Sequence, residues 1–233
     1  MEGTALEHSL LSRHRYLILG VALLLALILQ MGRSAFPYLR ESALTAAIAL
    51  VLLIVFDRRS HRVLALVAGA SVVATLWSLR LTGGTPSRSL ELVVHVGAVL
   101  FFAGAVAAVL RRLVERRVVR IDDILGTLCG YLLAAIAWAN LYSAIELTAP
   151  GAFALTGPIQ TQIDNWFGRE ATFTYYSLST MTTIGYGDIT PLAPAARSAS
   201  VLQGVFGQFY IAVIVAQLVG SKLAEGQAGE KQR

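Results

Sequence analysis

Long apolar blocks separated by short polar segments run along most of the 233-residue chain. Six runs lack Asp, Glu, Lys and Arg over most of the width of a bilayer: 16–32, 42–56, 63–79, 92–110, 124–145 and 198–220. The second run is the shortest, because its 15 residues would rise only about 22 Å as a helix against a hydrocarbon core of about 30 Å. Snorkelling by Arg40 would close that gap. The pattern predicts an all-α membrane protein with six transmembrane helices.

Composition and charge agree with a membrane location. The chain is 56% hydrophobic and 14% charged, with a mean hydropathy of +0.65, which is more apolar than a soluble domain requires. Its net charge of +5 reflects orientation, because 13 of the 19 Lys and Arg residues fall on one side of the predicted spans. The positive-inside rule then places both termini in the cytoplasm, in a plasma or inner membrane. Cys129, the only cysteine, is expected to be a small buried residue.

The same pattern divides the chain into four parts. Residues 1–110 form a four-helix transmembrane bundle, 111–123 a basic linker, 124–220 a domain of two spans with a long intervening segment, and 221–233 a cytoplasmic tail. The linker predicts a helix on the inner membrane surface, with anionic lipid headgroups near its arginines: Arg111, Arg112, Arg116, Arg117 and Arg120. A cytoplasmic loop that merely obeys the orientation rule is the alternative. Asp122 and Asp123 are expected to cap the fifth helix.

The segment between the last two spans is the most informative part of the chain. It contains a helix-like stretch, 169–182, followed by a loop with two glycines that leads through Pro191 and Pro194 into the last span. Because the flanking spans cross the membrane in opposite senses, this segment must enter from the outside and return. Such backbone is tolerated at membrane depth only where protein or water surrounds it. A re-entrant pore helix and loop are therefore predicted.

The loop has the residues that a cage of backbone carbonyls needs. A dehydrated cation requires several oxygen ligands, and successive carbonyls can supply them if the backbone adopts unusual angles. Glycine reaches positive φ without a Cβ penalty, so Gly185 and Gly187 are expected at alternate positions of such a strip. Thr183 adds a hydroxyl oxygen. Tyr186 is expected to point away from the ion path and brace the loop against its helix.

A nine-residue run resembles the selectivity filter of tetrameric potassium channels: Thr180-Met181-Thr182-Thr183-Ile184-Gly185-Tyr186-Gly187-Asp188. The resemblance covers about residues 124–220, which it identifies as a pore domain, and it implies a homotetramer with K⁺ as permeant ion and no cofactor. It implies a filter made of Thr183, Ile184, Gly185, Tyr186 and Gly187, in which the carbonyls of Thr183, Ile184, Gly185 and Tyr186 and the Thr183 hydroxyl coordinate K⁺. It assigns filter support to Asp188, Thr182, Tyr175, Tyr176 and Ser179.

This chain departs from the family pattern beside the filter. Tyr175 and Tyr176 stand where many relatives have tryptophans, and Ser179 stands where some have a glutamate. These departures bear on the stability of the filter more than on its selectivity.

The last span carries a candidate hinge and a candidate cavity lining. Gly207 lies where the resemblance places a gating hinge, and glycine weakens a helix by about 1 kcal/mol relative to alanine. Close helix packing is the alternative, since Gly204 lies three residues earlier. One helical stripe is expected to line the cavity: Gln208, Ile211, Val215 and Val219.

The first four spans predict no conventional voltage sensor. Voltage-sensing helices carry repeated arginines, and the fourth run, 92–110, contains neither Arg nor Lys. Glu91 and His95 lie one turn apart and are a candidate proton-sensitive pair, with an ordinary hydrogen bond as the alternative. Glu146 either supports the pore loop or faces water.

Two other transport functions compete with a potassium-selective channel. A non-selective cation channel would usually lack the tyrosine or a glycine of the filter, and a channel-related potassium transporter would usually carry four degenerate loops in one chain. This chain has one loop with both glycines. An enzyme is disfavoured, because the four histidines show no metal-ligand spacing and no nucleophile motif occurs.

Overall fold

The computed structural model describes residues 15–31, 37–55, 87–115, 121–157 and 166–230, with a few single positions between them. Six helices lie within these ranges: α2 (Arg15–Met31), α3 (Pro37–Ile54), α5 (Arg88–Glu115), α6 (Ile121–Thr148), α7 (Trp166–Met181) and α8 (Pro194–Glu230). Strands β1 (Phe153–Leu155) and β2 (Ile189–Pro191) form an antiparallel two-stranded sheet. The protein is helical, and the all-α prediction is corrected only by this short sheet.

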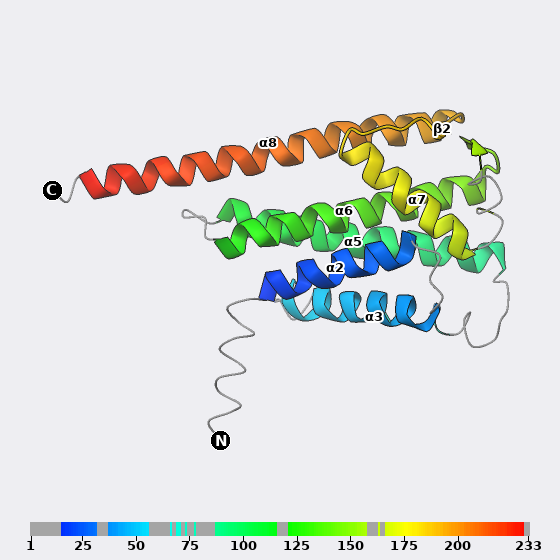
Figure 1. Ribbon diagram of the computed structural model, residues 1–233, viewed down its shortest axis with the longest axis horizontal. Helices are drawn as coiled ribbons and strands as arrows, with labels where there is room; N and C mark the ends of the chain where they lie inside the picture. Colours follow the sequence, from blue (N-terminus) through cyan, green and yellow to red (C-terminus); the bar gives the residue numbers. More distant parts are fainter. Residues whose placement is uncertain are drawn as a thin grey trace, which may run out of the picture.

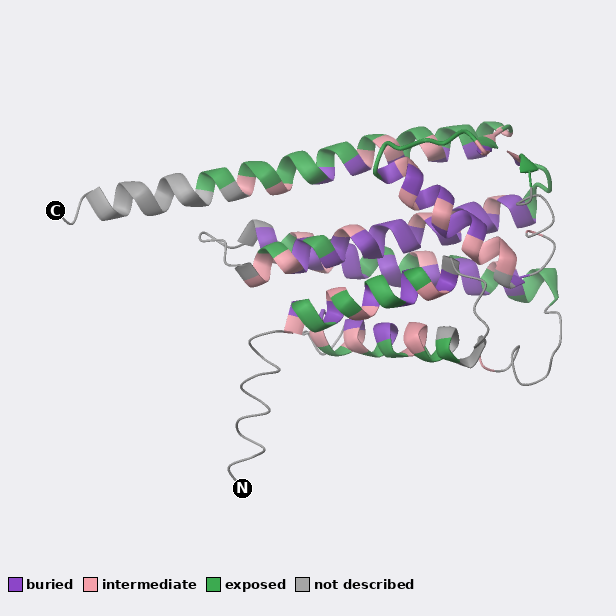
Figure 2. Ribbon diagram, viewed as in Figure 1, coloured by how far each residue is buried: buried purple, intermediate pink, exposed green. Residues whose placement is uncertain are grey.

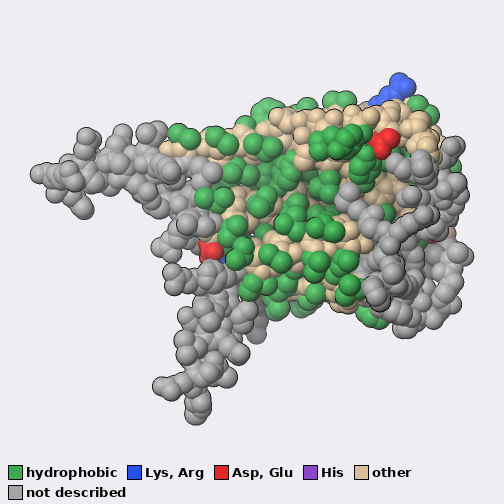
Figure 3. Space-filling model, in the orientation of Figure 1, with side chains coloured by type: hydrophobic (Ala, Val, Ile, Leu, Met, Phe, Trp, Pro, Cys, Tyr) green, Lys and Arg blue, Asp and Glu red, His purple; other side chains and the backbone are tan. Residues whose placement is uncertain are grey.

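Three of the described helices are long and apolar enough to cross a membrane: Arg88–Leu113, Asp122–Thr148 and Pro194–Gln217. Arg15–Gln30 and Ser42–Ile54 are apolar but shorter. The third predicted span, 63–79, lies almost entirely outside the described residues, so the count of six stays a prediction. On the face seen in Figure 3, hydrophobic side chains cover most of the described surface, and charged side chains lie near its two ends.

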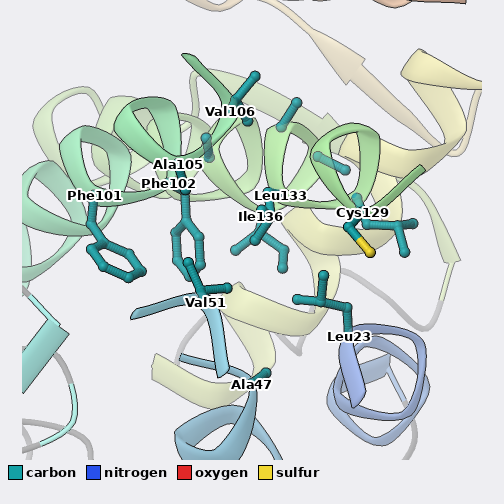
Figure 4. Packing of buried hydrophobic residues seen from close by; sticks show 14 of the residues in the cluster. Leu23, Ala47, Val51, Phe101, Phe102, Ala105, Val106, Cys129, Leu133 and Ile136 are labelled. Carbon is teal, nitrogen blue, oxygen red and sulfur yellow. The ribbon is translucent and has the colours of Figure 1, made fainter. Parts of the chain in front are cut away.

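The helices form an elongated bundle around an apolar core. In Figure 1 they lie side by side, and α2 begins at the same end of the molecule at which α8 finishes. The core joins all six described helices, and Figure 4 shows Leu23 of α2, Val51 of α3, Phe102 of α5 and Leu133 of α6 within it. Cys129 is buried in the same cluster, as predicted.

The predicted linker helix is not a separate element in the described residues. Helix α5 continues to Glu115 and α6 begins at Ile121, whereas 116–120, with Arg116, Arg117 and Arg120, lie outside the described residues. Arg112 donates to the carbonyl oxygens of Ile54 (3.0 Å) and Val55 (2.8 Å). Its guanidinium therefore caps the C-terminal end of α3, where unpaired carbonyls attract a cation, and this corrects its assignment to lipid. Arg111 is exposed.

Two further boundaries differ from prediction. Asp122 and Asp123 lie inside the first turn of α6 rather than at its cap, where carboxylates still oppose the positive end of the helix dipole. Helix α8 runs unbroken through 37 residues to Glu230, so 221–230 continue the helix of the last span. Helix α6 is mostly buried and α8 mostly exposed, as Figure 2 shows.

The segment between α6 and α8 folds back on itself. Figure 1 shows α7 running in between these helices and the following loop returning beside α8 to β2. The register of the sheet pairs Leu155 with Ile189, directly after the glycine loop. Strand β1, which precedes α7, thus pairs with β2 and holds the segment that follows the glycine loop.

Candidate functional site

The candidate site is the loop that follows α7. The helix closes with bonds from Thr182 N to the Leu178 carbonyl (2.9 Å) and from Thr183 N to the Thr180 carbonyl (3.2 Å). The Thr182 hydroxyl also donates to the Leu178 carbonyl (2.7 Å). Beyond Thr182 the backbone leaves the helix, and residues 183–187 are all exposed in the single chain.

Positive φ angles occur at every second residue of this loop. They are 61° at Thr183, 55° at Gly185 and 80° at Gly187, whereas Ile184 and Tyr186 have none. The prediction of left-handed backbone at both glycines is confirmed. Thr183 was not expected to share it, because a β-branched residue rarely adopts positive φ.

The amide groups of the loop point towards α7. Ile184 N donates to the Ser179 carbonyl (2.9 Å), and Gly185 N donates to the Ser179 hydroxyl (3.1 Å). A stretch whose φ angles alternate in sign can gather its N–H groups on one side. Ser179, buried on α7, thus anchors the loop by its backbone and its side chain.

The two tyrosines of α7 have different partners. The ring of Tyr175 stacks on Tyr186, with centroids 6.1 Å apart and planes 8° apart, and its hydroxyl donates to Asp188 Oδ2 (2.7 Å). Tyr176 instead meets Ser200 of α8, with 2.7 Å between the oxygens. Within one chain, Tyr175 therefore braces Tyr186, whereas Tyr176 joins α7 to α8.

The chain after the loop is held from the other side by residues before α7. The Asp188 carbonyl accepts bonds from Thr156 N (2.9 Å) and the Thr156 hydroxyl (3.1 Å). Glu146 is buried and accepts bonds from Gly151 N (2.7 Å) and Phe153 N (3.2 Å). Of the two roles left open for Glu146, the structure shows support of the loop segment.

Gln203 of α8 is a structural residue that the sequence analysis missed. It is fully buried, accepts a bond from the Tyr142 hydroxyl of α6 and donates to the Ser177 hydroxyl of α7 (2.6 Å). One amide therefore joins the three helices around the loop. Gln203 is one of three glutamines in the apolar run 198–220, and such a residue was the available signal, since polar residues at membrane depth usually face the protein interior.

Helix α8 contacts the base of the loop at Gly207. A Cβ added there would lie 3.0 Å from the Met181 carbonyl oxygen, whereas one added at Gly204 would meet nothing within 4 Å. The structure therefore shows close packing at Gly207, where α8 is continuous. The stripe of Gln208, Ile211, Val215 and Val219 is exposed along α8.

Glu91 and His95 do not form the expected pair. Glu91 accepts a bond from Arg169 of α7 (2.6 Å), and Nδ1 of His95 lies 2.9 Å from Asn140 Oδ1 of α6. Each side chain thus meets a neighbouring helix instead of the residue one turn away.

Two long apolar helices, α6 and α8, flank the short helix α7 and the glycine loop. Residues 128–221 match the family model described as "Ion channel", from within α6 to within α8. This match, over 94 of the 233 residues, supports an ion-channel domain, and the long apolar helices suit a membrane protein. No curated protein and no solved structure matches the chain.

Proposed function

We propose that the chain is one subunit of a homotetrameric potassium-selective channel, with Thr183, Ile184, Gly185, Tyr186 and Gly187 as its share of the selectivity filter. The alternation of positive φ at Thr183, Gly185 and Gly187 carries this proposal. An ordinary surface loop has no need of three left-handed residues at alternate positions, one of them β-branched.

The loop geometry suits a dehydrated monovalent cation. The N–H groups of Ile184 and Gly185 are used by Ser179, so the carbonyl oxygens are available on the opposite side as a row of neutral ligands. Rings of such oxygens replace the hydration shell of K⁺. The Thr183 hydroxyl adds a ligand at the inner end, and Tyr186, Tyr175 and Asp188 hold the loop from behind.

Four copies are needed to close the ring, because each chain brings one loop. The exposure of α8 supports this assembly: 22% of its most apolar window is buried in the single chain, against 61% for α6. In the tetramer one face of α8 would meet neighbouring chains. The stripe from Gln208 to Val219 would line the cavity, into which α7 aims the negative end of its dipole.

The same proposal extends to orientation and gating. Both termini would lie in the cytoplasm, and lipid anions would lie near Arg111 and the arginines of 116–120. All six predicted spans would cross the membrane. A hinge at Gly207 would require loss of its contact with Met181.

The proposal is tested by potassium-driven flux in liposomes that contain the purified protein, with sodium and barium as controls. We expect flux that potassium carries, sodium does not carry, and barium blocks. Gly185→Ala should abolish it, because alanine is strained at a φ of 55°. Gly151→Ala is the matched control, since Gly151 also has positive φ (80°) and open space but lies outside the filter.

Two outcomes would contradict the proposal. Equal sodium and potassium flux would favour a non-selective cation channel. Selective flux that survives Gly185→Ala but fails in Gly151→Ala would mean that the filter lies elsewhere.

A further inference from the structure

A polar junction lies where α7 begins, between the front helices and the pore domain. It consists of Gln30 of α2, Glu91 and His95 of α5, Asn140 of α6, and Arg169 and Glu170 of α7. These polar and charged side chains lie next to the apolar core that joins the same helices.

Polar contacts connect the front helices to α7, among them His95 Nδ1 at 3.7 Å from Glu170 Oε1. Arg169 donates to Glu91 Oε2 at 2.6 Å, and Gln30 Nε2 donates to Glu170 Oε2 at 2.5 Å. The His95 ring also stacks on Trp166, the first residue of α7, at 4.5 Å. The first turn of α7 is thus held by both α2 and α5.

The junction is buried, which makes its polarity costly unless every group is paired. Relative exposure is 8% for Glu91 and 1% for His95, and 13% for the Arg169 side chain. Apolar residues would pack helices together at less cost, but they would fix the position of α7 less sharply. Charge-assisted bonds of defined direction set the rotation and depth of a helix.

The held end of α7 lies one rigid element away from the filter. Arg169 and Ser179 are ten residues apart in the same helix, which is about 15 Å. Ser179 binds the N–H groups of Ile184 and Gly185. A shift of the first turn of α7 is therefore carried to the filter backbone.

We propose that the Glu91–Arg169 pair is a positioning device through which the front helices of the same chain hold the filter in its conducting shape. This inference rests on the proposed channel function and gives the front helices a role in it. Glu91 and Arg169 are positioning residues, since neither touches the ion path.

The test compares Glu91→Gln, Arg169→Gln and the double variant with the natural protein in the liposome flux assay. Each single change should lower potassium flux at least fivefold, and the double variant should lose no more than the worse single variant, because both changes break one pair. Arg88→Gln is the matched control. Arg88 sits at the same end of α5 but donates to the Leu147 carbonyl of α6 (2.7 Å), so its loss should change flux less than twofold.

Thermal stability of the assembled protein is measured in parallel. Should Glu91→Gln fail to assemble, Glu91→Asp replaces it, since aspartate keeps the charge but not the reach to Arg169. Natural flux in both single variants, or losses that add up in the double variant, would overturn the positioning role. That failure is distinct from failure of the channel proposal, in which the natural protein itself would carry no selective flux.

Discussion

At the scale of single residues, Thr183 is the least expected feature of the site. Its φ of 61° places a β-branched residue in the left-handed region, which costs about 1–2 kcal/mol. Such strain persists only where the surrounding contacts over-determine it, and it concentrates at functional sites. Here Thr183 N bonds to the Thr180 carbonyl, and the next residue, Ile184, bonds through its N–H to the Ser179 carbonyl.

Tyr175→Phe should destabilise the filter, because it removes the bond to Asp188 while keeping the ring on Tyr186. A hydrogen bond to a charged group contributes about 1.5–3 kcal/mol, so we expect sustained potassium flux to fall by roughly tenfold. Tyr176→Phe is the control, because its hydroxyl meets Ser200 rather than the filter segment. Equal flux in the two variants would remove Tyr175 from the filter support.

At the scale of elements, the contact between α7 and α8 decides between packing and bending at Gly207. The Met181 carbonyl lies where the first atom of a side chain would go, and a main-chain atom cannot move aside cheaply. Gly207→Ala should therefore lower the free energy of unfolding by about 1–3 kcal/mol. Thermal unfolding of the purified protein measures this effect, with Gly204→Ala as the control that has open space within the chain. A change in open probability without loss of stability would instead support the hinge.

Helix α5 makes a separate prediction about gating. Its stretch 92–110 carries neither Arg nor Lys, whereas a charge that crosses the field contributes about 2.3 kcal/mol per 100 mV. Open probability should therefore change little between −100 and +100 mV. Single-channel recording in a planar bilayer measures it, and a steep dependence would contradict this interpretation of α5.

The sequence predicted those elements whose signals are local. The hydropathy runs and the glycine pattern placed α6, α7, α8 and the loop, because each signal lies within the segment that it describes. The β1–β2 pair escaped prediction, since strands of three residues carry no periodicity. The roles of Gln203, Arg169 and Glu91 also escaped it, because their partners lie on other helices and only the tertiary fold brings them together.

At the scale of the whole molecule, the exposed face of α8 predicts assembly. Val201, Leu202 and Phe209 are each at least 60% exposed in the single chain. Part of this face is expected to contact neighbouring chains instead of lipid. We expect native mass spectrometry from detergent to give the mass of four chains. A monomer or a dimer as the largest species would exclude a filter of four carbonyl rings.

The central claim is that the alternating backbone of Thr183, Gly185 and Gly187 forms a filter for potassium. The most direct measurement is the reversal potential in a planar bilayer with potassium on one side and sodium on the other. The account predicts a reversal potential displaced strongly in the direction set by potassium, and a loss of this displacement or of all current in Gly185→Ala. A reversal potential near zero, with current flowing equally for both ions, would contradict it.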